Sequence, residues 1–501
     1  MPKKNDYKQV LAILAIVLTL LPPGARAGWT EQPTPSLGRQ QAVQVSSTET
    51  RPERSRSGGF PISFVPDGGQ RNPAIVCSPE DRCLSVWEDS RDGGWRIYGQ
   101  WVVNGELDGQ NFLISIAASE QRDPAVAYNS SKDEYLVVWW DDRDRVLTGY
   151  NLYGRLIAGQ GEAGANDCPI ATAPGDQQVP DVTYNNTVGE YLVVWQDDRY
   201  GDWDIYGRRI ADDCAPSDNE FGISRVSGRQ WYPAVAHDSV HNRYLTVWWD
   251  NRNSPASADD IYGQILSSDG SPLSGNFPVS TAAGFQGRAD VAWNSTVHDY
   301  LVVWADNRNT VSSGFDIYAQ RVSSQGELLD GESNPGADPA VNLAVSRATG
   351  DQDHPTVVCN GDNPQYLVVW QDLRHGNQDI FAQPVSAQGE LLDQAGNPDA
   401  DPATNLPIST APNNQERPAL SDVQDKYRIV WQDSRHFDFV EEDIYEQQVS
   451  FHGEPLGYAI SLITAPTPQT SPAVAYAPPP PPYQEGLGGV NRAIEWPLPL
   501  P

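Results

Sequence analysis

The chain has 501 residues, and 66 Asp and Glu against 34 Lys and Arg give it a formal net charge of −32 at pH 7. Nucleic acids and anionic membrane surfaces bind basic proteins, so this charge excludes both as expected partners. The 42 glycines and 41 prolines would interrupt long helices, which points to an all-β protein.

Residues 1–27 are predicted to be a secretory signal peptide. Basic residues precede the apolar run VLAILAIVLTLL (10–21), and Ala25 and Ala27 form a small-residue cleavage site. The run is too short to span a bilayer, no later stretch is apolar enough to do so, and no cysteine follows it to carry a lipid. We therefore expect no membrane span and a secreted, periplasmic or cell-surface protein.

The rest of the chain divides into three parts. Residues 28–57 are expected to be a flexible polar lead-in, residues 58–476 the folded domain, and residues 477–501 a proline-rich tail. Within the domain the motif Trp-x-Asp-x-Arg ends a hydrophobic strand seven times, and a strand of the Ile-Tyr type follows each copy. The marker tryptophans are Trp87, Trp139, Trp195, Trp248, Trp304, Trp370 and Trp431.

Each unit also contains an earlier strand such as PAVAY (124–128) and a short segment such as FGISR (221–225). Four strands in each of about seven repeats predict a β-propeller of four-stranded blades. Seven blades are favoured, and FPISF (60–64) is left over to help close the ring. The alternative has an eighth composite blade, completed by QAVQV (41–45) and RAIEW (492–496).

The loop between the two main strands carries a family resemblance. Its run Asp-x-Arg-x-Gly-x-x-Asp-Ile-Tyr, as in DDRYGDWDIYG (197–207), resembles the repeat of TolB-type, WD-repeat-like propellers over about residues 60–476. The resemblance implies a propeller fold and protein partners. The amino-terminal α/β domain of TolB has no counterpart here, so TolB's own role is not implied.

Five cysteines in an exported chain indicate disulfides. Internal alignment places Cys77 opposite Cys83 across a hairpin, where other repeats have two tyrosines, and predicts a bond between them. Cys359 faces a tyrosine and is expected to be a free, buried thiol. Cys168 and Cys214 lie in loops and are candidates to bridge neighbouring repeats.

The Asp and Arg of the repeated motif are interpreted as structural blade fasteners. A group present in every blade cannot form one asymmetric active site, whereas Arg forks and Asp caps stabilise loops. The pairs are Asp89 and Arg91, Asp141 and Arg143, Asp197 and Arg199, Asp250 and Arg252, Asp306 and Arg308, Asp372 and Arg374, and Asp433 and Arg435.

Two further groups are candidates for ligand binding. No cofactor is expected apart from calcium, for which dense carboxylates in the third loop offer oxygen ligands, although Arg199 opposes a cation there. Tryptophans that break the repeat would grip a sugar ring or the apolar anchor of a partner, or else fill space between blades. The calcium candidates are Asp197, Asp198, Asp202 and Asp204, and the tryptophans are Trp140, Trp203, Trp231 and Trp249.

The sequence predicts a binding function. It contains no zinc-protease, nucleophile-elbow, phosphate-loop or haem motif, so no catalytic residue is predicted and a non-enzymatic role is favoured. We interpret the chain as an exported binding scaffold that holds a protein partner on one face of the ring. A carbohydrate-binding or glycan-cleaving propeller, with a polysaccharide as partner, and a structural cell-surface component are the alternatives.

Overall fold

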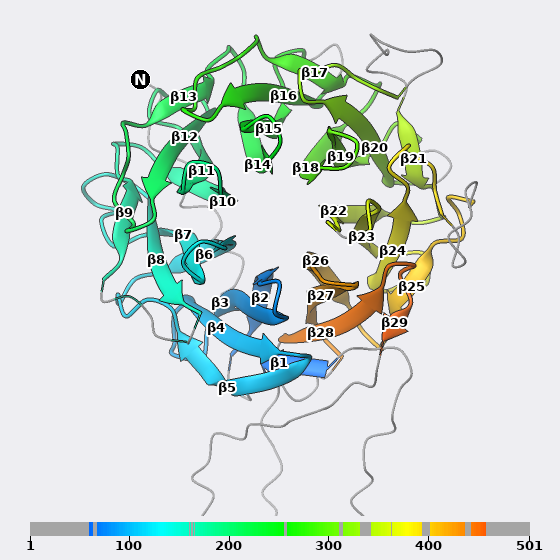
Figure 1. The fold of residues 1–501 in the computed structure, drawn as a ribbon, viewed down its shortest axis with the longest axis horizontal. Coiled ribbons are helices and arrows are strands. Elements are labelled where there is room, and N and C mark those ends of the chain that lie inside the picture. Colours follow the sequence, from blue (N-terminus) through cyan, green and yellow to red (C-terminus); the bar gives the residue numbers. More distant parts are fainter. Residues whose placement is uncertain are drawn as a thin grey trace, which may run out of the picture. The chain divides into compact units, whose positions relative to one another are not determined.

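A computed structural model shows seven antiparallel, four-stranded blades arranged as a β-propeller, and no helix in the part of the chain that it describes (Figure 1). The predicted fold class is confirmed. The predicted signal peptide, lead-in, carboxy-terminal tail and strands at 41–45 and 492–496 lie outside the described residues. These are residues 60–63, 68–159, 161, 164, 166–254, 258–309, 314–330, 342–361, 363–392, 401–435 and 442–456.

The inner two strands of each blade match the predicted PAVAY and Trp-x-Asp-x-Arg segments. The innermost strands surround the ring axis (Figure 1). They are β2 (Gln70–Cys77), β6 (Gln121–Asn129), β10 (Gln177–Asn185), β14 (Gln230–Asp238), β18 (Gln286–Asn294), β22 (Gln352–Cys359) and β26 (Gln415–Val423). The second strands are β3 (Arg82–Asp89), β7 (Glu134–Asp141), β11 (Glu190–Asp197), β15 (Arg243–Asp250), β19 (Asp299–Asp306), β23 (Tyr366–Asp372) and β27 (Lys426–Asp433).

The outer two strands of each blade form the rim of the ring. The third strands are β4 (Arg96–Val103), β8 (Asn151–Ala158), β12 (Asp204–Ala211), β16 (Asp260–Ser267), β20 (Asp316–Ser323), β24 (Asp379–Val385) and β28 (Asp443–Ser450). The outermost strands are β5 (Glu106–Leu113), β9 (Cys168–Ala171), β13 (Phe221–Ser224), β17 (Phe277–Ser280), β21 (Leu343–Ser346), β25 (Leu406–Ser409) and β1 (Phe60–Ser63), with β29 (Pro455–Leu456) beside β28.

The amino-terminal strand closes the ring. We number the blades 1 to 7 in chain order, so that blade 1 holds β2 to β5 and blade 7 holds β26 to β28 together with β1. In blade 7, β1 pairs antiparallel with β28, with Phe60 opposite Glu446. Blade 1 contacts blade 7 directly, since the Cys77 N–H donates to Ser421 Oγ at 3.0 Å. The ring therefore closes at seven blades, and the eight-bladed alternative is wrong.

A buried charge network joins blade 7 to blade 1. The fully buried Arg428 of β27 donates from Nε to Oδ1 of Asp81, in the turn between β2 and β3, at 2.7 Å. It also forms an ion pair with Glu446 of β28, which is equally buried. Lys426 Nζ lies 3.0 Å from Asp81 Oδ2. Four charged groups thus bridge the point of closure.

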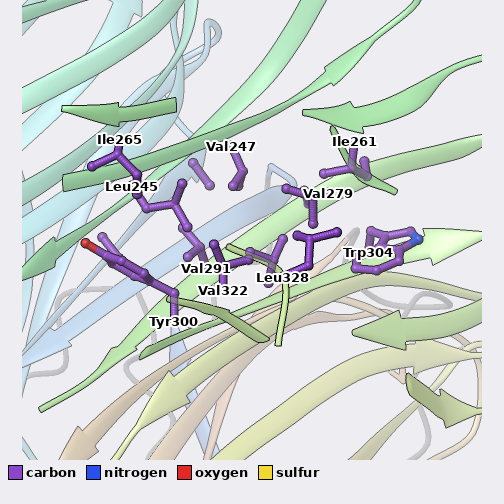
Figure 2. Packing of buried hydrophobic residues seen from close by; sticks show 14 of the residues in the cluster. Leu245, Val247, Ile261, Ile265, Val279, Val291, Tyr300, Trp304, Val322 and Leu328 are labelled. Atoms are coloured by element: carbon purple, nitrogen blue, oxygen red, sulfur yellow. The ribbon is translucent and has the colours of Figure 1, made fainter. Parts of the chain in front are cut away.

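The hydrophobic core lies between neighbouring blades. Among the described residues, one buried cluster occupies each of the seven blade-to-blade interfaces. Figure 2 shows the interface where Leu245 and Ile261 of blade 4 meet Tyr300 and Trp304 of blade 5. Trp304 is fully buried, as are the other six marker tryptophans, and each packs against the blade before it.

The repeated motif forms the same contacts in all seven blades. In blade 3, Trp195 Nε1 donates to Asp197 Oδ2 at 2.9 Å, and the Arg199 N–H donates to Asp197 Oδ1 at 3.0 Å. The Arg199 guanidinium lies 4.3 Å from the centroid of the Tyr206 ring on the next strand. The carboxylate thereby links the buried indole to the loop, and the arginine covers the aromatic ring.

The cysteines follow the predicted register. Cys77 and Cys83 are opposite each other across the β2–β3 hairpin and form a disulfide. A second disulfide joins Cys168 at the start of β9 to Cys214, which follows β12 in the next blade. Cys359 is free, but it is half-buried rather than buried, and burial raises the pKa of its thiol to about 12. Both disulfides are compatible with an oxidising compartment.

The part of the chain that the structure describes contains no helix long and apolar enough to cross a membrane.

Candidate functional site

Each inner strand contains a β-bulge that turns one side chain toward a central pocket. In β10 the register shifts between Gln178 and Asp181, and Val179 adopts a φ of 51°. A residue before proline ordinarily stays extended, and left-handed backbone costs a β-branched residue about 1–2 kcal/mol. Repetition of this strain in every blade shows that the surrounding fold imposes it. The seven bulged residues, called the ring residues below, are Asn72, Asp123, Val179, Tyr232, Arg288, His354 and Arg417.

The ring residues line one pocket of about 310 Å³, together with the residue that follows each of them. This volume lies at the lower end of the range of small-molecule sites. The seven side chains belong to six residue types, although proline follows six of them. A position with only a structural role would repeat one residue type, as the marker Trp does, so the central pocket is the candidate functional site.

The sequence analysis missed the ring residues. One feature of the sequence could have revealed them: the residue before the proline of the PAVAY-type strand varies from repeat to repeat, although the strand itself is similar in each. The predicted Trp140 and Trp249 follow marker tryptophans, and Trp249 pairs across the sheet with Trp231, the residue before the bulge of blade 4. Two predicted residues therefore contact residues of the pocket, but the residues that line it were not predicted.

Two carboxylates meet on the side of the pocket formed by blades 1 and 2. Asn72 Nδ2 donates to Glu88 Oε1 at 2.6 Å and to Asp123 Oδ1 at 3.1 Å. The Asp123 N–H donates to Glu88 Oε1 at 2.9 Å, and Trp140 Nε1 donates to Asp123 Oδ2 at 2.7 Å. Carboxylates from adjacent blades thus share one amide donor at the pocket wall.

A glutamate is not required at position 88 for packing. In blade 3 the same position holds Gln196, whose Oε1 accepts the N–H of the bulged Tyr232 in the next blade at 3.2 Å. Gln371 of blade 6 makes the same bond with the next bulge at 3.0 Å. Glu88 accepts the equivalent N–H of Asp123. A glutamine would make the same bond, so the glutamate adds a group that can bind a proton without being needed for this contact.

The environment makes these two carboxyl groups weaker acids than usual. Burial raises the pKa of Glu88, and the neighbouring charge of Asp123 raises it further. Burial likewise raises the pKa of Asp123. Arg71 Nε at 2.9 Å and Arg122 Nη1 at 3.2 Å from Glu88 Oε2 hold the glutamate in place. Coupled carboxyl groups with raised pKa values in a cleft are typical of sites that transfer protons.

A cluster of aromatic rings lies beside the pocket at blades 4 and 5, and its Tyr232 lines the pocket. Tyr232, which is 45% exposed, stacks on Trp249 with ring centroids 5.5 Å apart and an interplanar angle of 25°. Trp231 and Phe285 contact the same indole at 5.4 Å and 4.7 Å. Gly287 leaves room for them, because a Cβ there would lie 2.7 Å from the Phe285 ring. The result is an aromatic wall in which the Tyr232 ring lines the pocket and is supported by the rings of Trp249, Trp231 and Phe285.

Basic side chains line the side of the pocket formed by blades 5, 6 and 7. Arg288 Nη1 lies 3.2 Å from His354 Nδ1, and Arg288 forms an ion pair with Asp353. Arg417 is exposed in the pocket, and its backbone N–H donates to Gln371 Oε1. The pocket thus has an acidic side, an aromatic side and a basic side.

The four predicted tryptophans are half-buried rather than exposed. Trp231 and Trp249 contact each other in the aromatic wall, and Trp140 binds Asp123 at the pocket. Trp203 makes no ring contact within the described chain, and its carbonyl accepts the Gln230 N–H at 2.8 Å. Trp140 therefore contacts the pocket residue Asp123, and Trp249 stacks on the pocket residue Tyr232, but none of the four tryptophans lines the pocket itself.

The predicted calcium candidates Asp197 and Asp198 each accept hydrogen bonds from groups of the protein. Asp197 accepts hydrogen bonds from Trp195 and Arg199, and Asp198 Oδ1 accepts the Asp176 N–H at 2.6 Å. Burial raises the pKa of Asp204 to about 6. In the described ranges no group of three or more His, Cys, Asp or Glu side chains is arranged to hold a metal ion. Calcium binding stays a prediction.

No known protein family and no curated protein matches the sequence. The TolB resemblance thus has no support beyond the propeller fold that it implied.

Solved structures offer only distant likenesses. A protein of unknown function from Dyadobacter fermentans is 10% identical, with a TM-score of 0.46 over 66% of this chain and 99% of its own. An intramolecular trans-sialidase from Ruminococcus gnavus is 10% identical, with a TM-score of 0.42 over 80% of this chain and 98% of its own. A Penicillium chrysogenum α-L-arabinanase with arabinobiose is 13% identical, with a TM-score of 0.41 over 81% of this chain and 100% of its own. None assigns an activity. The fold and the pocket define the chain as a seven-bladed β-propeller with an asymmetric central pocket.

Proposed function

We propose that this propeller binds carbohydrate and receives one sugar residue in the central pocket. The observation that supports the proposal is the supported Tyr232–Trp249 stack beside ring residues that offer hydrogen bonds. A sugar presents C–H groups on its ring face, which pack on an aromatic surface, and hydroxyls at its edges, which need donors and acceptors. A pocket lined on different sides by aromatic and polar groups suits both needs.

The pocket supports a sugar better than a protein partner. A stable protein interface is a broad surface that buries about 800 Å² on each side. This site is instead a concave space of about 310 Å³, which suits a small ligand. The protein-scaffold function predicted from the sequence stays a prediction, and a polysaccharide is the partner that we propose.

A glycan array followed by calorimetry on the best ligand tests sugar binding. We expect Tyr232→Ala and Trp249→Ala to weaken binding about tenfold or more, which corresponds to about 1.4 kcal/mol or more of lost contact. Tyr200→Ala is the matched control, because Tyr200 is a 68% exposed aromatic residue that does not line the pocket. Absence of any bound glycan, or equal losses in all three variants, would refute the proposal.

Glycan cleavage is a second candidate, favoured by the coupled Glu88–Asp123 pair. In hydrolysis a protonated carboxyl group gives its proton to the glycosidic oxygen as that bond to the anomeric carbon breaks, and water supplies the hydroxyl that the carbon receives and gives its remaining proton to a carboxylate. The carboxyl group that lines the pocket is Asp123, and Glu88 lies behind it.

Conservative variants separate cleavage from binding. Glu88→Gln installs the residue found at this position in other blades, and Asp123→Asn keeps the shape of the side chain. If the wild type releases new reducing ends from the glycan that it binds, both variants should release them at least about 100-fold more slowly, since general acid catalysis contributes about 10²–10⁴. A wild type that binds the glycan without shortening it would exclude cleavage and leave binding in place.

A further inference from the structure

The basic side of the pocket contains positive charge that the protein itself does not fully neutralise. In this strongly acidic chain, every Trp-x-Asp-x-Arg arginine is paired with the aspartate of its own motif. Arg417 differs, because no hydrogen bond or ion pair of its guanidinium occurs among the described residues, and it is exposed in the pocket. Arg288 has one carboxylate partner, Asp353, and is 38% exposed.

These basic groups come together against electrostatic repulsion. Burial lowers the pKa of His354, and the charges of Arg288 and Arg417 lower it further. Burial also lowers the pKa of Arg288, with Arg417 adding to the effect. His354 is therefore a neutral ring, and the like charges of Arg288 and Arg417 facing one cavity disfavour the empty site, so an anion placed between them removes that cost. Arg288, His354 and Arg417 are the bulged residues of three successive blades, so the same backbone feature brings all three to one side of the pocket.

The opposite side of the pocket limits where an anion can sit. On blades 1 and 2 the described lining residues include no free basic side chain, and Asn72 and Asp123 can bond hydroxyl groups there. A ligand with one anionic group is therefore oriented. Its charge faces the basic side, its hydroxyls face the acidic side, and its ring lies near the aromatic wall.

We propose that the sugar bound in the pocket is anionic and that Arg288, His354 and Arg417 recognise its oxyanion. The inference rests on the proposed carbohydrate function and adds the ligand class. The oxyanion is either the carboxylate of a uronic acid or a sulfate ester, since a guanidinium fork binds either through paired N–H groups.

The test begins with an array of neutral, uronate-containing and sulfated oligosaccharides. The best binder is then compared by calorimetry with its methyl-esterified or desulfated form, at low and high salt. We expect the tightest binders to be anionic, the neutralised form to bind about tenfold more weakly, and the difference to shrink as salt rises. Whether uronate-containing or sulfated oligosaccharides bind more tightly identifies the source of the oxyanion.

Variants place the recognition in the pocket. Arg417→Gln should remove most of the preference for the anionic form, so that the anionic and neutralised forms bind this variant with affinities within about twofold of each other. Arg347→Gln is the control, because Arg347 is also exposed and does not line the pocket. Binding of neutral glycans in preference to anionic ones, or an anion preference that survives Arg417→Gln, would overturn this inference and leave the sugar-binding function standing. Absence of all glycan binding would instead remove the proposed function.

Discussion

Replacing the buried Arg428 tests how the ring is closed. Six blades have leucine three residues before the marker Trp, and only blade 7 has an arginine there. The facing strand has Gly or Ala in those six blades at the place of Glu446. The buried charges therefore substitute for an apolar contact that the same fold forms six times. Arg428→Leu restores one half of that contact and leaves Glu446 unpaired.

The expected magnitude follows from the contacts of each charge. Both Arg428 and Glu446 are fully buried, and burial already raises the pKa of Glu446. Breaking such a pair on one side costs about 3–5 kcal/mol. Asp81 keeps Lys426 at 3.0 Å, so the loss should come mainly from Glu446. Arg428→Leu with Glu446→Ala removes both charges and should recover most of the lost stability, because an apolar replacement of a buried ion pair is often neutral or better.

Urea unfolding at pH 7, followed by tryptophan fluorescence, measures these differences. The single variant should unfold at a clearly lower urea concentration, and the double variant should be more stable than the single one by roughly 2 kcal/mol or more. A single variant within about 1 kcal/mol of the wild type, or a double variant no more stable than the single one, would refute the reasoning.

Three further predictions concern stability. Burial and the charge of Asp433 raise the pKa of Asp443 to about 8. The native state then holds this proton more tightly than the unfolded state, so stability should fall as pH rises from about 4 to about 8. Asp443→Asn should flatten that part of a plot of melting temperature against pH. Trp304→Ala should cost about 3–5 kcal/mol in urea, because it empties a fully buried site. Replacing Cys77 and Cys83 together by alanine should cost about 2 kcal/mol by releasing a short loop, and an unchanged midpoint would contradict this.

Much of the fold was predictable because its determinants are local in sequence. A hydrophobic strand that ends in Trp-x-Asp-x-Arg forms its indole, carboxylate and guanidinium contacts within one hairpin, so each copy reports its own blade. The Cys77–Cys83 bond was predictable for the same reason, since hairpin register alone places the two residues opposite each other.

Only the tertiary structure decided the pocket. Its ring residues are more than 50 positions apart in sequence, and they meet because the ring closes at seven blades. At the six ring residues that precede proline, the positive φ contradicts the extended backbone expected there, and inter-blade hydrogen bonds such as Tyr232 N–H to Gln196 Oε1 help to hold it. The sequence by itself therefore determined the repeated blade, whereas closure of the ring decided which seven side chains face one another.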